Sequence, residues 1–380
     1  MENSKKHIII IAGEASGDMH AAKLVNEIKK IDPSISFSGL GGSNMEASGV
    51  KLYCNLTKLA IVGFYEVLKH YKEIRQIFYS TLDKIKEVKP SAVILVDYPG
   101  FNLRLAKEIK KLGIKVIYYV SPQIWAWKKN RVYSIKKNVD KMLVFFAFEK
   151  DLYDKYDVNA DFVGHPLIDI VKTTKSKEEF VNDNKLDNDK LTIGILPGSR
   201  KKEIETLLPI MLNSAKILSQ KYNNIQFIIS KAPTIDRSLI DEHLDDSINA
   251  TIVEQDYYNA IKACDVCMVT SGTATLETTI LEKPMVIVYK TSLITWLLIM
   301  SFVKIRYVGL ANIIAGKEII PECIQFNAKA DIIAKRLEEI FTNESKMSSI
   351  KSELKLVKEY IGSSGASQNA AKSVMRVLQL

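Results

Sequence analysis

Cysteine is scarce in this chain. Its 380 residues include only Cys54, Cys264, Cys267 and Cys323, which are too few and too scattered to stabilise so long a chain by disulfides. We therefore predict reduced thiols and a cytosolic compartment. Cys264 and Cys267 form a C-x-x-C pair, but no second pair or nearby histidine completes a zinc-binding pattern, so we expect both to pack in the core.

Long hydrophobic runs are also absent. The first run, Ile8 to Ala12, follows a short charged lead and is shorter than the apolar part of a signal peptide, so it predicts a first strand. The longest apolar stretch, Leu293 to Val303, covers eleven residues, against about 20 for a helix that crosses a bilayer. We predict no membrane span, and we expect the 293–303 helix to be buried in a core or to lie at an interface.

Arginine is the third scarce residue. Of the 53 basic residues only eight are arginine, and with 44 acidic residues they give a net charge of +9. A lysine surplus of this kind is usually a solvated surface, and a polyanionic partner or an anionic membrane is the alternative. With 47% apolar and 26% charged residues, the composition excludes collagen, coiled coil and extensive disorder. The length predicts two domains, or three.

The chain does contain a regular alternation of short β-branched runs and longer amphipathic segments, which predicts βα units and parallel sheets. A polar, charged stretch between Val171 and Lys190 divides the alternation into two halves, and we expect it to be a linker or an exposed connection. Ligands should then bind at loops that follow the strands. The expected strands are 7–12, 34–38, 92–96, 115–120 and 141–145 in the first half, and 191–196, 225–230, 250–253, 266–270 and 284–289 in the second.

Two loops in the first half carry residues suited to chemistry. In AGEASGDMH, Gly13 and Gly17 bracket a tight turn into a helix whose first backbone N–H groups could hold an anion. The G-x-x-x-G spacing does not match the dinucleotide fingerprint. In VDYPGFN, Asp97 ends an apolar strand, where a carboxylate can act as a general base toward a substrate hydroxyl. A helix cap or turn former is an equal alternative for Asp97.

Two loops in the second half suit phosphate groups. LPGSRKKE places Arg200 at a helix N-terminus, and in a chain poor in arginine its bidentate guanidinium suits an anion. A plain surface arginine is the alternative. In SGTATLE, Gly272 and Thr273 open a helix, and Glu277 lies one turn further on. Glu277 can accept two ribose hydroxyls or can merely complement the helix dipole. The two loops together predict a nucleoside diphosphate site.

Two stretches indicate lipid. The first is an apolar cluster at the start of an expected helix, and the second sets two tryptophans beside basic residues with no acid among them, which suits a lipid headgroup region. A packed core with a solvated face is an equal alternative, and the short patch does not favour nucleic acid. The apolar cluster comprises Leu59, Ile61, Val62, Phe64, Val67 and Leu68, and the aromatic–basic stretch comprises Trp125, Trp127, Lys128, Lys129 and Arg131.

Several of these motifs, taken in order, resemble the lipid A disaccharide synthases over nearly the whole chain. The motifs are AGEASGD, IVGFYEVL, VDYPGFN, YYVSPQIWAWKKNR, FVGHPL, LPGSR, SGTATLE and LANIIAG. The resemblance implies an α/β protein of the GT-B type, with two Rossmann-like domains and a cleft between them. It also implies an inverting transfer, without metal or cofactor, of 2,3-diacylglucosamine from UDP-2,3-diacylglucosamine to 2,3-diacylglucosamine 1-phosphate. The products would be UDP and the β-1,6-linked tetraacyl disaccharide 1-phosphate.

The resemblance assigns a role to each loop. Asp97 matches the position of a catalytic base for the acceptor 6-hydroxyl, and the two lipid-like stretches match a membrane and acyl-chain contact. The positions that match UDP binding are Gly198, Ser199, Arg200, Ser271, Gly272, Thr273, Glu277 and Asn312, and those assigned to the acceptor loop are Glu14, Ser16 and His20.

The same resemblance implies the domain organisation. Residues 1–172 would form an acceptor and lipid domain, joined by C-terminal helices from about 345–380, and residues 190–344 would form the UDP-sugar domain. The protein would act at the cytoplasmic face of the inner membrane of a Gram-negative bacterium, and a homodimer is one assembly that it allows. An enzyme like UDP-N-acetylglucosamine 2-epimerase, which would not need the lipid-like stretches, and a non-catalytic lipid- or nucleotide-binding protein, which would not need Asp97, are the alternatives.

Overall fold

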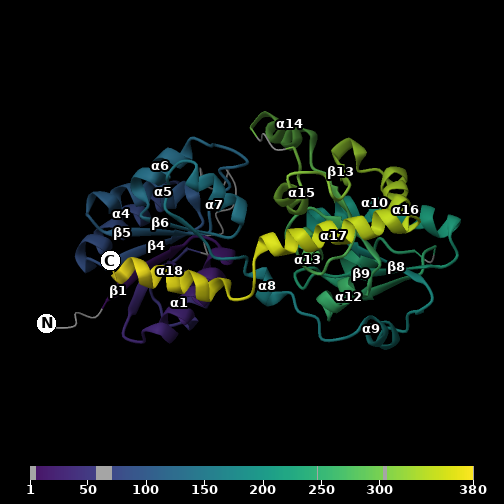
Figure 1. The fold of residues 1–380 in the computed structure, drawn as a ribbon, viewed down its shortest axis with the longest axis horizontal. Helices are drawn as coiled ribbons and strands as arrows, with labels where there is room; N and C mark the ends of the chain where they lie inside the picture. The colour runs from purple at the N-terminus through teal and green to yellow at the C-terminus, as the bar shows by residue number, and fades with distance from the viewer. Residues whose placement is uncertain (1–5, 57–70, 246, 303–305, 380) are drawn as a thin grey trace. The chain divides into compact units, whose positions relative to one another are not determined.

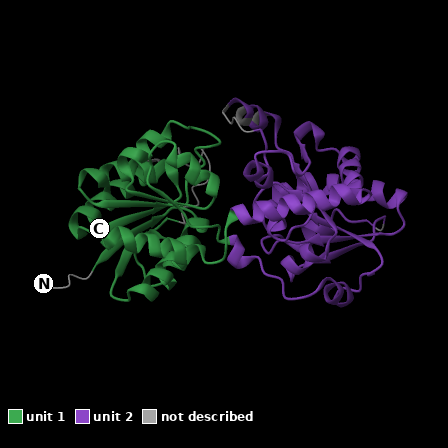
Figure 2. Cartoon of the chain, in the orientation of Figure 1, with its two compact units in different colours: residues 1–166, 361–380 green, residues 167–360 purple. Residues whose placement is uncertain are grey.

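The structure describes residues 6–56, 71–245, 247–302 and 306–379. In this computed structural model the chain divides into two units (Figure 2). Unit 1 comprises residues 1–166 and 361–380, and unit 2 comprises residues 167–360. Each unit is a parallel β-sheet with helices packed on it (Figure 1).

The sheet of unit 1 has seven strands in the order β3-β2-β1-β4-β5-β6-β7, all parallel. The chain moves outward from β1 in one direction and from β4 in the other, so a topological switch point lies between them. The strands are β1 (His7–Ala12), β2 (Ser36–Gly41), β3 (Lys51–Asn55), β4 (Ala92–Val96), β5 (Lys115–Tyr119), β6 (Lys141–Val144) and β7 (Ala160–Phe162). The helices are α1 (Ala15–Ile31), α2 (Ser43–Ala47), α4 (Tyr71–Val88), α5 (Pro99–Lys111), α6 (Arg131–Asn138), α7 (Ala147–Asp154) and α18 (Ala366–Gln379).

Unit 2 repeats this plan with six parallel strands in the order β10-β9-β8-β11-β12-β13, and its switch point lies between β8 and β11. The strands are β8 (Leu191–Leu196), β9 (Ile225–Ser230), β10 (Ala250–Val253), β11 (Val266–Thr270), β12 (Met285–Tyr289) and β13 (Glu322–Ile324). The helices are α8 (Leu167–Ile170), α9 (Lys177–Asp183), α10 (Lys201–Lys221), α11 (Arg237–Asp241), α12 (Tyr257–Ala263), α13 (Thr273–Ile280), α14 (Leu293–Phe302), α15 (Leu310–Ala315), α16 (Ala330–Phe341) and α17 (Glu344–Ile361).

The central strands are buried on both faces. In β1 the four isoleucines Ile8 to Ile11 have no exposed surface, and β4 is equally buried. Continuous β-branched runs are typical of parallel strands that are covered by helices on both sides. The expected strands 7–12, 92–96, 191–196 and 266–270 are confirmed with the same bounds. The two cysteines of the C-x-x-C pair, Cys264 and Cys267, are buried in this core as predicted.

Asp18 of the AGEASGD motif lies in the first turn of α1 and has a structural role there. Its carboxylate is 2% exposed and accepts hydrogen bonds from the backbone N–H groups of Gly42 (2.7 Å), Asn44 (3.0 Å) and Met45 (3.1 Å), and from the Asn44 side chain (2.8 Å). It therefore caps α2 and holds the turn after β2, at Gly42, against α1. Loss of this carboxylate would leave buried backbone donors at the turn without the acceptor that they share.

The polar stretch between the two halves is not simply an exposed linker. Within it Ser176 caps α9 by accepting a hydrogen bond from the Glu179 backbone N–H (3.1 Å), and Phe180 and Val181 are buried. α9 packs against α12. The sequence reading missed this because only two apolar side chains dock the segment onto unit 2.

The two C-terminal helices belong to different units. α17 is part of unit 2 up to Tyr360, and the chain enters unit 1 at Ile361, later than the position near 345 expected from the resemblance. α18 then packs along α1, and the Lys6 ammonium donates to the Leu378 carbonyl (3.3 Å). Both termini of the described chain therefore contribute to unit 1.

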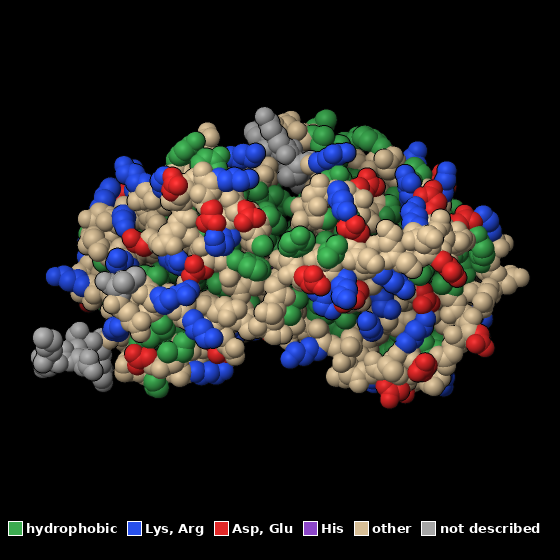
Figure 3. Space-filling model, viewed as in Figure 1, with side chains coloured by type: hydrophobic (Ala, Val, Ile, Leu, Met, Phe, Trp, Pro, Cys, Tyr) green, Lys and Arg blue, Asp and Glu red, His purple; other side chains and the backbone are tan. Residues whose placement is uncertain are grey.

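α14 presents apolar side chains to solvent. Leu293, Leu297 and Met300 are 57%, 65% and 59% exposed. Figure 3 shows apolar side chains together with basic ones over this helix, while elsewhere on that face basic and acidic side chains are interspersed. Among the described residues no helix is both long and apolar enough to cross a bilayer.

Candidate functional site

A cavity of about 490 Å³ lies at the switch point of unit 2. The loop after β8 forms one side and the loop after β11 forms another, as the sheet topology requires. The residues expected to bind UDP that line this cavity are Gly198, Ser199, Arg200, Ser271, Gly272, Thr273 and Glu277. The structure thus brings seven of the eight predicted positions together.

The N-terminus of α13 opens into the cavity. Gly272 is its N-cap residue, has φ of +149° and would meet no atom within 4 Å if it carried a Cβ, so the backbone here is accessible from the cavity. No side chain caps the first turn. Its backbone N–H groups and the helix dipole can therefore bind a negatively charged group.

The loop after β8 differs from expectation in one respect. The Glu203 carboxylate accepts hydrogen bonds from the backbone N–H groups of Ser199 (3.0 Å) and Arg200 (3.2 Å), so a side chain of the same helix already satisfies two backbone donors of the loop expected to bind phosphate. Glu203 also pairs with the Arg200 guanidinium (3.3 Å), whose side chain is 81% exposed. The group that this loop offers to an anion is therefore the guanidinium, which also lines the cavity.

Glu277 is held by two phenols. The Tyr258 hydroxyl donates to Oε1 (3.1 Å) and the Tyr257 hydroxyl donates to Oε2 (3.3 Å). Burial raises the pKa of Glu277 above its usual value, and the two phenol hydrogen bonds partly offset this effect. The carboxylate lines the cavity with its orientation fixed from one side, which leaves lone pairs for a ligand.

The sequence reading missed several groups in this cavity. Tyr257, Tyr258 and Thr270 line it, and the buried Thr270 hydroxyl has no hydrogen-bond partner among the described residues. Glu203 could have been found from its place at the third position of α10, where an acidic residue bonds back to the N-cap. The tyrosines gave no signal, because they belong to no recognisable motif and only the fold brings their hydroxyls to Glu277.

Asn312 requires a correction, because it does not line this cavity. It is fully buried, and its amide donates to the Ile320 carbonyl (2.8 Å) and to Glu322 (2.8 Å). Its oxygen accepts from the backbone N–H groups of Ile319 (2.8 Å) and Ile320 (3.0 Å). In this structure Asn312 holds α15 to the segment before β13, so its amide is used internally.

In unit 1 the loops after β1 and β4 meet at the switch point. The Tyr98 ring lies directly over Gly13, where a Cβ would come within 2.4 Å of a ring carbon. Asp97 and Tyr98 both have φ of +47°, in the left-handed region that costs energy for residues other than glycine. The Asp97 carbonyl is fixed by the Tyr118 hydroxyl (2.6 Å) and by the Asn102 amide (2.8 Å). This strained turn is held from several sides.

The electrostatics of Asp97 suit a base that works near neutral pH. Burial raises its pKa to about 6, and the nearby charge of Glu14 contributes in the same direction. The backbone N–H of Tyr98 opposes this shift. Glu14, the N-cap residue of α1, is thus brought close to Asp97 by the fold.

The other acceptor-loop residues occupy different environments. Ser16 is exposed in the first turn of α1. The His20 ring packs edge-on against Phe145 (5.2 Å) and Tyr119 (6.5 Å between centroids), and its Nδ1 is buried with no hydrogen-bond partner in the described part of the chain. Burial, with a smaller contribution from Lys23, lowers the pKa of His20 to about 4. His20 is therefore neutral at pH 7.

The aromatic–basic stretch is divided between core and surface. Trp125 is partly buried, packs against Phe148 and donates from Nε1 to the buried Glu149 (3.2 Å). Trp127 is 38% exposed, with Lys128 Nζ 4.6 Å and Arg131 Cζ 5.0 Å from its ring centroid. Lys129 is exposed. The predicted cluster Leu59, Ile61, Val62, Phe64, Val67 and Leu68 lies outside the described residues.

The fold and the cavity define a class of protein with two Rossmann-like α/β domains, and the predicted GT-B fold class is confirmed. Solved structures of similar fold include MurG from Acinetobacter baumannii, with 14% identity and a TM-score of 0.60, covering 98% of this chain and 99% of that chain. The S. aureus MnaA–UDP co-structure has 11% identity and a TM-score of 0.63, and the match covers 99% of this chain and 97% of that chain. At these identities the likeness concerns the fold.

The sequence comparisons are more specific. The model of the lipid-A-disaccharide synthetase family matches residues 8–376. The lipid-A-disaccharide synthase of Syntrophus aciditrophicus is 38% identical over 378 residues, which cover 99% of each chain. That of Geobacter sulfurreducens is 38% identical over 378 residues, 99% of this chain and 98% of the relative. The chain belongs to the lipid-A-disaccharide synthetase family and is a glycosyltransferase, as the motifs predicted.

Proposed function

We propose that this enzyme transfers 2,3-diacylglucosamine from UDP-2,3-diacylglucosamine to the 6-hydroxyl of 2,3-diacylglucosamine 1-phosphate, with inversion and release of UDP. One observation carries the proposal. In this member of the family, the candidate base lies at the switch point of the unit 1 sheet, and the candidate nucleotide residues lie together at the switch point of the unit 2 sheet. Unit 1 would bind the acceptor and lipid, and unit 2 would bind the UDP-sugar.

Asp97 would act as the general base. Its carboxyl has a pKa of about 6, so it is largely ionised at pH 7 and still basic enough to accept a proton from the acceptor hydroxyl as the new bond forms. The strained turn fixes the backbone that carries it. Glu14 and His20 belong to the same edge of the sheet, and the neutral His20 ring can contact the acceptor without adding charge.

The cavity of unit 2 would bind UDP. Arg200 and the N-terminus of α13 would stabilise the diphosphate, whose negative charge grows as it leaves, and Glu277 would accept the ribose hydroxyls. One structure of similar fold was solved with UDP, which is consistent with this assignment.

The direct test is mass analysis of the products formed by the purified protein from the two proposed substrates. A tetraacyl disaccharide 1-phosphate with a β-1,6 linkage, formed in equal amount with UDP, is the expected result. UDP formed without disaccharide, or interconversion of the free UDP-sugar as an epimerase would give, would contradict the proposal.

Replacing Arg200 by alanine should weaken UDP binding about tenfold, because a charge-assisted pair with the diphosphate is lost. Titration calorimetry with UDP and with uridine separates the contribution of the diphosphate to binding from that of the nucleoside. Uridine carries no phosphate, so its affinity should stay within about twofold if the guanidinium acts on phosphate. Lys201→Ala, which removes the adjacent exposed cation, is the matched control. An equal loss of uridine affinity would contradict the assignment.

We also propose that the enzyme works as a peripheral protein on the cytoplasmic face of the inner membrane. The exposed apolar side chains of α14 and the Trp127 ring with its flanking cations are the described features that support this. No acidic residue occurs between Lys290 and Lys317, so this segment itself adds no negative charge that would repel an anionic lipid surface.

The double substitution Leu297→Ser and Met300→Ser should reduce binding to vesicles that contain anionic phospholipid by about tenfold, since two apolar side chains no longer enter the lipid. Cosedimentation measures the bound fraction. Leu356→Ser removes another exposed leucine, from α17, and should leave it unchanged. Equal effects of the two sets of substitutions would argue against a specific lipid contact.

A further inference from the structure

Two tyrosines that line the cavity beside Glu277 have no role in the chemistry proposed so far. Tyr257 and Tyr258 are consecutive on α12, and their hydroxyls reach different oxygens of the same carboxylate, at 3.3 and 3.1 Å. Their rings pack edge-to-face with centroids 5.4 Å apart. Both side chains line the cavity, as does Glu277 itself.

The two hydroxyls are donors throughout the working pH range. Burial first, and then the neighbouring Glu277 charge, raise the pKa of each phenol well above its usual value. A neutral phenol next to a carboxylate is stabilised by donating a hydrogen bond to it. Because each phenol uses a different oxygen, the carboxylate plane cannot rotate without breaking one of the two bonds.

A carboxylate fixed in this way is suited to a vicinal diol. Its two oxygens each keep lone pairs for a further donor, and the two adjacent hydroxyls of a ribose can meet both at once. We propose that Tyr257 and Tyr258 are positioning residues that hold Glu277 for both ribose hydroxyls and so make the pocket selective for ribonucleotides over 2′-deoxyribonucleotides. The inference rests on the proposed binding of UDP in this cavity.

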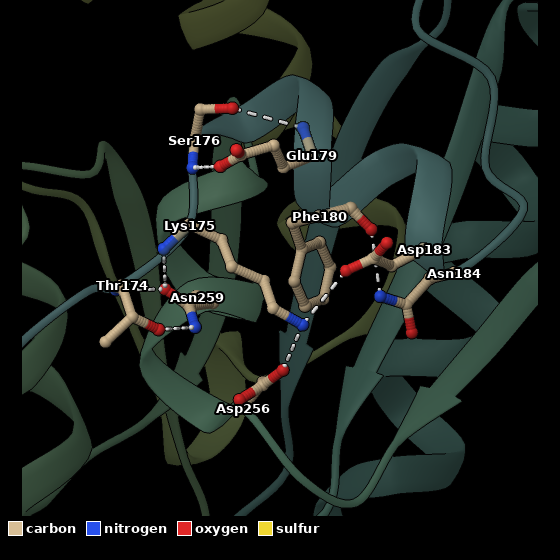
Figure 4. Close-up of polar contacts among 9 residues, drawn as sticks. All are labelled: Thr174, Lys175, Ser176, Glu179, Phe180, Asp183, Asn184, Asp256 and Asn259. Carbon is tan, nitrogen blue, oxygen red and sulfur yellow. Dashed lines mark hydrogen bonds and ion pairs between the residues drawn. The ribbon is translucent and has the colours of Figure 1, made fainter.

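The helix that carries the tyrosines is itself anchored (Figure 4). The Asn259 side-chain oxygen accepts from the backbone N–H groups of Thr174 (2.9 Å) and Lys175 (3.2 Å), and its NH₂ group donates to the Thr174 hydroxyl (3.1 Å). The Lys175 ammonium pairs with Asp256 (2.7 Å) and Asp183 (3.0 Å). Asn259 is 5% exposed, so the hydrogen bonds of its side-chain amide are shielded from water, unlike the ion pairs of Lys175.

These contacts fix the start of α12. Asp256, the N-cap residue, has φ of +60°, a conformation that needs support from its surroundings. The segment 174–184, which we term the strap, supplies it, and the buried Phe180 ring anchors the strap to unit 2. The ion pairs of Lys175 are partly exposed and contribute little, so the Asn259 amide is the main link between strap and helix.

The test is to measure Kd for UDP and for 2′-deoxy-UDP by calorimetry, with the full-length wild type, the single variants Tyr257→Phe and Tyr258→Phe, and the double variant. In the double variant UDP affinity should fall about tenfold. 2′-Deoxy-UDP lacks one of the two hydroxyls that would contact Glu277, so its affinity should change by less than about threefold. The UDP to 2′-deoxy-UDP preference of the wild type should therefore shrink, and each single variant should lie between.

Tyr222→Phe is the matched control, because it removes a tyrosine hydroxyl that donates to Glu338 elsewhere in unit 2. It should leave both affinities unchanged. Thermal unfolding of each variant separates a change of selectivity from a loss of folding, and the single variants carry the test if the double variant does not fold. Asn259→Ala should lower the same preference, since it releases α12 from the strap.

The outcomes are distinct. Wild type that does not bind UDP would overturn the proposed function. Wild type that binds UDP, with variants that keep its preference or lose both nucleotides equally, would overturn the positioning role and leave the proposed function standing. If Asn259→Ala keeps the wild-type preference for UDP over 2′-deoxy-UDP, the strap does not help to position the tyrosines.

Discussion

Replacing Asp97 by asparagine should lower kcat of the transferase by 10²- to 10⁴-fold, the range expected when a general base is lost. The amide is close in size to the carboxylate, and the Asp97 carbonyl remains held by Tyr118 and Asn102, so the turn should keep its shape. Binding of UDP in unit 2 should not change. Steady-state kinetics with both lipid substrates and calorimetry with UDP measure the two effects.

The pH profile gives the same prediction a second readout. A base must be ionised, so in the wild type the rate should rise with pH through about 6 and then level off. Glu14→Gln removes a charge that raises this pKa, and should move the rise to lower pH. The asparagine variant should show residual activity without this rise. A wild-type rate that is flat between pH 5 and 8 would contradict the assignment.

The Asp97→Asn variant, although less active, should be more stable than the wild type at neutral pH. The folded-state pKa lies above the ordinary value of 3.8, so the contribution of Asp97 to stability is fully present below pH 3.8 and is lost as pH rises through about 6. At pH 7.5 Asp97→Asn should therefore unfold at a higher denaturant concentration than the wild type. The upper limit of the gain is about 3 kcal/mol. Lower activity with unchanged or greater stability would show that the loss is not a folding defect.

The largest expected effect on stability comes from Asp18. Substitution by alanine leaves three backbone N–H groups and the Asn44 amide without their shared acceptor in a buried turn. We expect unit 1 to lose about 3–5 kcal/mol of unfolding free energy, the range found when a buried charged group is removed from its partners. Denaturant unfolding measures it.

The positions of the tryptophans allow the unfolding of unit 1 to be followed separately by fluorescence. Trp125 and Trp127 belong to unit 1 and Trp296 to unit 2, so a Trp296→Phe background makes the fluorescence report on unit 1. Asp18→Asn keeps one oxygen for Gly42 and Met45 but turns a donor toward Asn44, so its effect should be intermediate. Asp32→Ala, which removes an exposed turn carboxylate in unit 1, should have a small effect. Equal losses for Asp18 and Asp32 would contradict the capping role.

Periodicity was sufficient to predict the central strands and much less informative at the sheet edges. β1, β4, β8 and β11 are buried runs rich in β-branched and other apolar residues, and β9 and β12 have the same pattern. Of the four edge strands, β10 was predicted with its observed bounds, whereas β3, β7 and β13 were not, since each is partly exposed and has no continuous apolar run. A strand that depends on one neighbour for its hydrogen bonds carries little sequence signal of its own.

The candidate site divides in the same way. Arg200, Gly272 and Glu277 could be predicted because each follows a strand within a few residues, and the parallel topology then brings the loops together. Asn312 also lies in a recognisable motif, yet its neighbours use its amide. Whether a polar side chain faces a cavity or its own loop depends on three-dimensional contacts that a motif does not contain. Tyr257 and Tyr258 illustrate the converse, because they enter the cavity without any motif.

The pairing of α18 with α1 has a consequence for synthesis on the ribosome. Unit 2 is a single uninterrupted segment, so all of its strands and helices emerge before α18 does. Unit 1 begins first, but α18, which packs along α1, emerges only when the last part of the described chain has been translated. The order of maturation is thus reversed relative to the usual N-terminal-first sequence. During translation the side of α1 that α18 covers therefore stays exposed until the end of the described chain has emerged.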